Sequence, residues 1–183
     1  MRLFFAIPLQ DQLKQHIQDK MPLLDRNFPR GTWVKPENMH ITLLFLGEVE
    51  KSLVPELRES AIFLAKQFKA DSLVVNELGA FPSKKVVKTL FYALNHQEWL
   101  ENLGYDLRKN MFAFGINDNK GFHPHITLSR FRVPVKVNPR FNWNMHQIDH
   151  HFEVDRFELI ESKLSARGPA YRTVAKFYLN KEE

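Results

Sequence analysis

Two short stretches decide the fold of this chain: Met39-His40-Ile41-Thr42-Leu43 and Pro124-His125-Ile126-Thr127-Leu128. The letters His-Ile-Thr-Leu occur in both, and the two histidines are 85 positions apart. Each copy lies in a run of β-branched and aromatic residues flanked by glycine and proline, which predicts a strand. Because side chains alternate along a strand, each histidine should share a face with its threonine, while the isoleucine and leucine point into a core.

Two facing histidine–threonine pairs are suited to breaking a phosphodiester. Imidazole titrates near pH ~6.5, so one histidine can accept a proton while the other donates one. Threonine hydroxyls can donate hydrogen bonds to the non-bridging phosphate oxygens, where charge builds in the transition state. We therefore expect His40 and His125 to transfer protons and Thr42 and Thr127 to hold phosphate, without metal, cofactor or covalent intermediate.

Composition and length indicate which classes of protein fit this sequence and which kinds of site it excludes. The 183 residues suffice for one domain or two small lobes, and no apolar run approaches the ~20 residues needed to span a bilayer. The absence of cysteine excludes disulfides and cysteine-ligated zinc or iron–sulfur sites, and is compatible with a reducing cytoplasm. A net charge of +5 and a pI of about 9.4 favour an anionic partner such as RNA or a nucleotide.

The periodicity of the remaining sequence predicts alternating helices and strands. Helices are expected over residues 10–28, 52–68 (with Ser52 as N-cap) and 97–114. Strands are expected over residues 2–9, 32–34, 38–46, 71–80, 86–94, 123–131, 152–166 and 171–179, with a turn at 117–121, an irregular segment at 133–144 and a hairpin turn across 167–169. This pattern favours an α+β fold with two mainly antiparallel sheets facing across a central cleft and helices outside. Each half contains a helix followed by a His-x-Thr strand, which hints at duplication.

Further stretches accompany the two motifs, and in combination they are similar to one family. The chain resembles the RNA 2′,3′-cyclic phosphodiesterases, also called the 2′-5′ RNA ligase family, of the 2H phosphoesterase superfamily, whose signature is two His-x-Thr-x motifs. The resemblance covers nearly the whole chain, through residues 2–7, 33–49, 79–82, 122–130, 162–164 and 168–171.

The resemblance implies a single bilobal 2H phosphoesterase domain over residues 1–183 with pseudo-two-fold symmetry. It implies metal-independent hydrolysis of an RNA-terminal 2′,3′-cyclic phosphate to a 2′-phosphate. His40 would protonate the departing 3′-oxygen and His125 would activate water, although the near-symmetric motifs allow the two roles to be exchanged. The reverse reaction would join RNA ends by a 2′-5′ linkage. The expected partners are RNA with cyclic phosphate ends or small cyclic nucleotides, and the protein is expected to be a cytoplasmic monomer.

Arg130 is the fifth candidate site residue. The resemblance implies a role for it at the phosphate or nucleotide, but strict alternation places it on the opposite face from His125 and Thr127. A strand end or a β-bulge would resolve the conflict. Phe45 is predicted to be a core residue or a base-stacking one. His123 could lie at the edge of the cleft or simply on the surface, and Tyr171 could line the cleft or belong to the core.

Other patterns leave alternatives open. His146 and His150, with His151 beside them, could hold a metal ion or could belong to a solvated segment. Lys84, Lys85 and Lys88 could contact an RNA backbone or form a plain solvated face. Two competing functions follow: a non-catalytic nucleotide- or RNA-binding module of the same fold, and a metal-dependent hydrolase.

Overall fold

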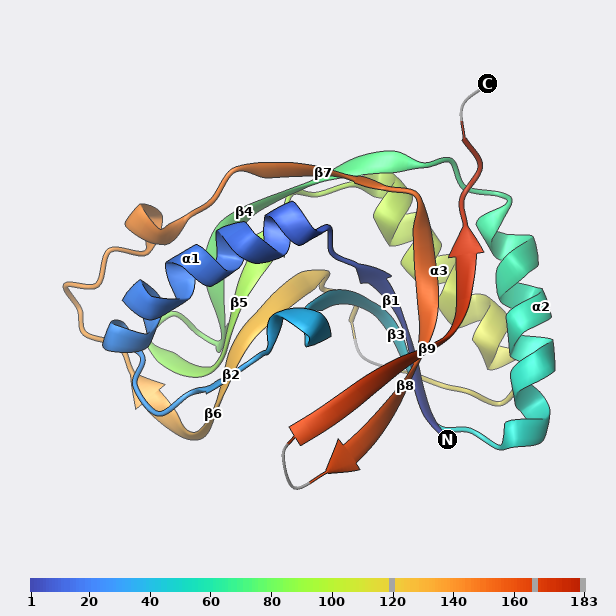
Figure 1. Ribbon diagram of the computed structural model, residues 1–183, viewed down its shortest axis with the longest axis horizontal. Coiled ribbons are helices and arrows are strands. Elements are labelled where there is room, and N and C mark those ends of the chain that lie inside the picture. Colours follow the sequence, from blue (N-terminus) through green and yellow to red (C-terminus); the bar gives the residue numbers. More distant parts are fainter. Residues whose placement is uncertain (119–120, 166–167, 182–183) are drawn as a thin grey trace.

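The computed structural model describes residues 1–118, 121–165 and 168–181, and its strands form one curled sheet (Figure 1). The order of the strands is β7-β4-β5-β6-β3-β1-β8-β9, and the short strand β2 lies outside this order and pairs with β6. Every pairing between these strands is antiparallel. The strands are β1 (Arg2–Pro8), β2 (Thr32–Trp33), β3 (His40–Glu48), β4 (Asp71–Pro82), β5 (Val86–Leu94), β6 (His125–Lys136), β7 (His150–Val154), β8 (Arg156–Ser165) and β9 (Gly168–Tyr178).

Strand β1 lies in the middle of one half of the sheet, between β3 and β8. All residues from Leu3 to Ile7 are buried, so this strand reads as a continuous apolar run, as expected for a strand covered on both faces. Phe5 packs into the main core beneath the sheet, whereas Phe4 and Ala6 form a small second cluster with Ile160 on the opposite face. That opposite face is the one that carries the candidate site.

The described residues form three α-helices beside the sheet: α1 (Asp11–Asn27), α2 (Val54–Ala65) and α3 (Glu98–Phe112). Figure 1 shows α2 and α3 together at one end of the molecule and α1 at the other. Each helix buries one stripe at helical spacing, for example Leu13, Ile17 and Leu24 of α1. Among the described residues, no helix is both long and apolar enough to cross a membrane.

The predicted α+β class with a mainly antiparallel sheet is confirmed, but the strands are not divided into two separate sheets. The halves are joined where β3 pairs with β6 through Ile41 and Ile126. A strand pairing of this kind is invisible in local periodicity, which is why two sheets were expected. The single bilobal domain and the pseudo-two-fold duplication stay predictions.

Several boundaries differ from those expected. Strand β6 continues into the first part of the segment predicted to be irregular, as far as Lys136, which pairs with Val86. Strand β7 pairs with β4 and is separated from β8 at Asp155, whereas one strand was predicted there. Ser52 is not a cap, because it lies in a 3₁₀ turn and α2 begins at Val54 without a side-chain cap. The expected turns fall partly on residues 119–120 and 166–167, outside the described residues.

Gly79 of β4 makes room for an aromatic side chain at the site. It pairs with Phe91 of β5, and a Cβ at Gly79 would lie 2.5 Å from the Phe91 ring. The Phe91 ring stacks on Phe81 at 4.3 Å between centroids. A side chain at position 79 would therefore displace a ring that is held on both sides.

We predict that Gly79→Ala lowers the free energy of unfolding by about 1–3 kcal/mol, because overpacking forces the Phe91 ring from its position. Urea unfolding measures the change. Phe91→Leu removes the colliding ring edge, so the double variant should lose clearly less stability than the sum of the two single variants. Strict additivity would contradict the predicted collision.

Candidate active site

The two motif strands present their histidine–threonine pairs as the alternation predicted. In β3, Ile41 is fully buried and Leu43 is 2% exposed, while His40 and Thr42 are half-buried. The second motif repeats this in β6, with Ile126 and Leu128 in the core and His125 and Thr127 half-buried on the other face. The isoleucine anchors thus fix which way each imidazole points.

Pairing between β3 and β6 brings the motifs together. Ile41 and Ile126 are direct partners in an antiparallel pair. Continuing that register by one residue places His40 across from Thr127 and Thr42 across from His125. Directly opposite residues have Cβ atoms about 4.5–5.5 Å apart, so the four side chains gather around one point.

A β-bulge resolves the question of Arg130. Along the β5–β6 pair, Phe91 is the partner of Thr127 and Leu90 is the partner of Ser129, so Leu128 is an extra residue. Leu128 and Ser129 are consequently both buried, and Arg130 returns to the face of the histidines.

The first motif contains the same irregularity at the same offset. Ala6 of β1 pairs with Thr42 and Phe5 with Leu44, so Leu43 is the extra residue there. Phe45 therefore occupies in β3 the place that Arg130 occupies in β6. Its side chain is 50% exposed, so the core role predicted for Phe45 is wrong.

All five predicted site residues line one cavity of about 400 Å³. Phe45 and Tyr171 line it as well, but His123 is not among its lining residues. Residues from both halves contribute, and the Asn38 side-chain amide donates to the Pro169 carbonyl at 3.1 Å across the rim. The lining comprises Thr32, Trp33, Val34, Lys35, Asn38, His40, Thr42, Phe45, Phe81, Thr89, His125, Thr127, Arg130, Gly168, Pro169 and Tyr171.

Hydrogen bonds to backbone carbonyls fix the tautomer of both histidines. His40 Nδ1 lies 2.7 Å from the Asn38 carbonyl oxygen, and His125 Nδ1 lies 2.6 Å from that of His123. A carbonyl oxygen only accepts, so Nδ1 carries hydrogen in both rings. Nε2 is then the free basic atom, and His40 Nε2 lies 3.1 Å from Thr42 Oγ1.

Aromatic rings enclose each imidazole. Phe4 and Tyr171 lie 4.9 and 5.4 Å from the His40 ring, and Phe81 and Phe91 lie 5.4 and 5.1 Å from the His125 ring, between centroids. These apolar walls restrict the rotation of the rings and lower the local polarity.

Enclosure changes the acidity of both histidines. Burial lowers the pKa of His40 from 6.5 to about 4, with the positive charges of His125 and Arg130 acting in the same direction and the Asn38 carbonyl opposing them. Burial likewise lowers the pKa of His125, with Arg130 again contributing and the His123 carbonyl opposing. Both imidazoles are therefore neutral at pH 7 in the empty site.

The sequence did not decide the function of the histidine-rich patch (His146, His150 and His151) or of the lysine cluster (Lys84, Lys85 and Lys88). His146 stacks on Phe141 at 4.7 Å, and His150 Nδ1 lies 3.2 Å from His16 Nδ1. Across the described ranges, no group of three or more histidine, cysteine, aspartate or glutamate side chains is arranged to hold a metal ion. Lys84 forms an ion pair with Glu77 and lies 5.5 Å from the Trp143 ring.

Several lining residues escaped the analysis of the sequence. Trp33, Lys35 and Phe81 lie within the stretches that carried the family resemblance, but nothing in their local pattern marked them as site residues. Thr89 reaches the cavity because it pairs with Arg130 across β5 and β6. That pairing is tertiary information, and no sequence signal would have found it.

Comparison with known proteins identifies the family. Residues 7–92 match the model described as LigT like Phosphoesterase. The chain is 30% identical over 178 residues to the RNA 2′,3′-cyclic phosphodiesterase of Thermotoga maritima, covering 95% of this chain and 93% of that protein.

Solved structures agree with this assignment. The crystal structure of TT0787 of Thermus thermophilus has a TM-score of 0.83 and 28% identity, with both chains covered completely. The structure of E. coli LigT complexed with 3′-AMP has a TM-score of 0.75 and 26% identity, and covers 97% of each chain. The chain belongs to the LigT-like phosphoesterases of the 2H phosphoesterase superfamily, and within them to the enzymes named RNA 2′,3′-cyclic phosphodiesterases.

Proposed function

We propose that this protein hydrolyses RNA-terminal 2′,3′-cyclic phosphate to a 2′-phosphate, using two histidines and no metal. The observation that supports the proposal best is the pairing of Ile41 with Ile126, which places both His-x-Thr pairs in one cavity. The relatives' name states this class of substrate, and the E. coli LigT structure with 3′-AMP shows a nucleotide on a similar fold. Cyclic mononucleotides fit the same chemistry.

Each side chain has a role in the proposed reaction. The Nε2 atom of His125 takes a proton from water as the water oxygen bonds to phosphorus. The bond from phosphorus to the ribose 3′-oxygen breaks, and His40 gives that oxygen its proton, which leaves a 2′-phosphate and a 3′-hydroxyl. Thr42, Thr127 and Arg130 bind the non-bridging oxygens and stabilise their charge.

The lowered pKa of both histidines constrains this mechanism. A neutral imidazole is ready to act as a base, but the acid must first acquire a proton that the empty site does not hold. The negative charge of the bound phosphodiester favours the protonated imidazole and raises its pKa. Substrate binding would therefore protonate the histidine that acts as the general acid.

The same arrangement could also join RNA ends. A ribose 5′-hydroxyl in place of water would give a 2′-5′ linkage by the same proton transfers. Water is far more abundant than RNA ends, so hydrolysis should dominate. We also propose that the protein acts as a single bilobal domain, as a monomer and in the cytoplasm.

We predict that a short RNA with a 2′,3′-cyclic phosphate end is converted to the 2′-phosphate in the presence of EDTA. His40→Ala and His125→Ala should each lower kcat/KM by about 10²–10⁴, the range for removal of a general acid or base. Chromatography against 2′- and 3′-phosphate standards measures the product.

His96→Ala is the matched control, because His96 is exposed, pairs with Glu101 and lies outside the cavity. Loss of turnover on EDTA treatment would favour a metal-dependent hydrolase. Tight binding of the RNA without cleavage would favour the non-catalytic binding module.

We predict that binding of a phosphodiester takes up a proton at His40. The His40 pKa should be about 4 in the empty site and clearly higher in the complex. Because the complex then binds more protons than the free protein, affinity should rise as the pH falls from 7.5 towards 5. NMR titration of the ring protons, with a deoxydinucleotide whose diester charge stays constant, measures both effects.

His40→Gln should flatten the pH dependence of affinity, and the signals of exposed His96 should not respond to the ligand. An affinity for the deoxydinucleotide that stays constant between pH 7.5 and 5 would contradict proton loading by the substrate.

A further inference from the structure

We propose that a row of three arginines, which starts in the cavity and leads out of it, binds the end of the RNA chain. In this row of Arg30, Arg130 and Arg132, here called the arginine track, Arg130 would hold the reacting phosphate between the histidines, and Arg132 and Arg30 would hold the backbone phosphates that precede it. The proposal rests on the proposed function and narrows its substrate to oligoribonucleotides.

The track begins on β6. Over the four residues after the bulge, and before the second register shift that precedes Val135, burial alternates: Ser129 is fully buried, Arg130 is exposed, Phe131 is 5% exposed and Arg132 is exposed. Arg130 and Arg132 therefore share the face of the cavity. Two residues of a strand span about 7 Å, which is close to the length of one extended nucleotide.

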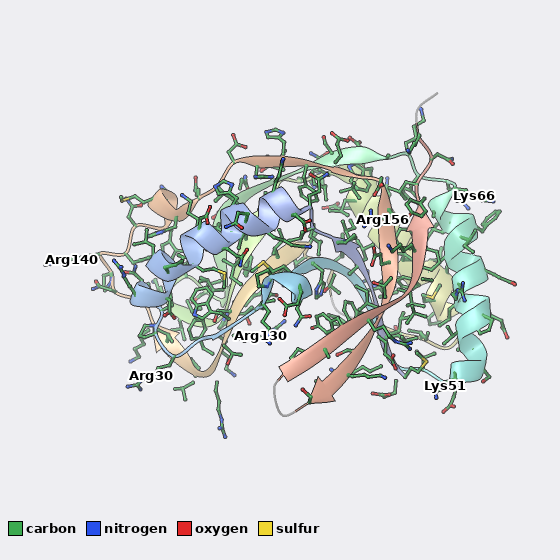
Figure 2. The ribbon with its side chains drawn as sticks, in the orientation of Figure 1. Arg30, Lys51, Lys66, Arg130, Arg140 and Arg156 are labelled. Carbon is green, nitrogen blue, oxygen red and sulfur yellow. The ribbon has the colours of Figure 1, made fainter. Side chains whose placement is uncertain are left out.

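Arg30 joins the track from the neighbouring chain segment. Thr32 of β2 pairs with Arg130 in an antiparallel register, which leads residue 30 towards residue 132. Between them, Gly31 lies so close to β6 that a Cβ there would be 2.8 Å from the Phe131 ring and 2.3 Å from Ser129 Oγ. Figure 2 shows Arg30 and Arg130 in the same half of the molecule, with Lys51 and Lys66 at the opposite end.

The backbone at Arg30 supports a functional reason for its position. Its φ is 69°, in the left-handed region that non-glycine residues rarely adopt. Such a conformation costs free energy and persists where the surrounding structure enforces it. Here it turns the chain out of α1 and places an arginine at the edge of β6.

The charges of the track are not neutralised by the protein. Within the part of the chain that the structure describes, none of the three arginines has a carboxylate partner. Two carboxylates of this half have other partners: Asp25 accepts from Trp33 Nε1 at 2.6 Å, and Glu77 pairs with Lys84. Unpaired guanidinium groups match the fork of a phosphate, and binding RNA would release its counterions.

The position of the track distinguishes substrates by length. Arg130 lines the cavity, but Arg30 and Arg132 do not. A cyclic mononucleotide in the cavity ends before it reaches them, whereas an RNA chain continues past the cavity wall. The track should therefore favour oligoribonucleotides without changing how a mononucleotide reacts.

The test compares two substrates in Arg30→Gln/Arg132→Gln and in the wild-type protein. One is a five-nucleotide RNA with a 2′,3′-cyclic phosphate end, and the other is a 2′,3′-cyclic mononucleotide. We expect kcat/KM to fall by about tenfold for the RNA and by less than about twofold for the mononucleotide. The slope of log affinity against log salt should become shallower by about 1.4, since each phosphate contact to a single strand contributes about 0.7.

Lys51→Gln/Lys66→Gln is the control, because it removes the same charge from the far end of the molecule. It should leave both substrates unchanged, and thermal melting checks that all variants fold. Equal losses for both substrates, or no loss for the RNA, would overturn the arginine track.

A binding measurement separates this proposal from the proposed function. Fluorescence anisotropy with a labelled five-nucleotide RNA ending in an unreactive 3′-phosphate needs no turnover. If neither substrate is cleaved but the arginine variant still binds this RNA about tenfold more weakly, the proposed function fails and the track stands. If cleavage occurs but binding is unaffected by the variant, the track fails alone.

Discussion

The backbone pairing of Ile41 with Ile126 is the contact on which the site depends. It joins the two halves of the sheet, and its two side chains are fully buried. Because the pairing is antiparallel, the histidine of each motif lies across from the threonine of the other. A register slip of one residue in either motif strand would turn the imidazole of that strand into the core and its isoleucine towards the cavity, at a large cost in apolar burial. The hydrophobic core thus enforces the arrangement of the polar groups.

Two β-bulges then shape the cavity. The extra residues, Leu43 and Leu128, follow their histidines at the same offset. Each bulge buries two consecutive residues and brings the next side chain back to the cavity, Phe45 in one strand and Arg130 in the other. The different residues at this equivalent position, Phe45 and Arg130, give the cavity one aromatic and one cationic side.

Aromatic enclosure and positive charge act together on the histidines. Burial and Arg130 both favour neutral imidazoles, so in the empty cavity the histidines carry no positive charge, whereas Arg130 does. An incoming phosphate reverses this balance, because its negative charge stabilises imidazolium more than it stabilises imidazole. In this scheme the ligand that needs the acid also creates it, which restricts proton transfer to the occupied site. The arginines outside the cavity would act earlier, by attracting the RNA chain to this face.

The sequence by itself determined most of the strands, the inward and outward faces of the two motifs, and the identity of the two His-x-Thr pairs, because alternation and composition act within a few residues. The family could also be recognised from the sequence, since the stretches on which the resemblance rests are short and contiguous. Only the tertiary structure decided that the halves share one sheet, that Arg130 faces the histidines, that Phe45 is exposed and that Thr89 reaches the cavity. Each of these depends on a bulge or on a pairing between strands far apart in the chain. Such pairings are set by how whole strands fit against one another, and no short window of residues contains that information.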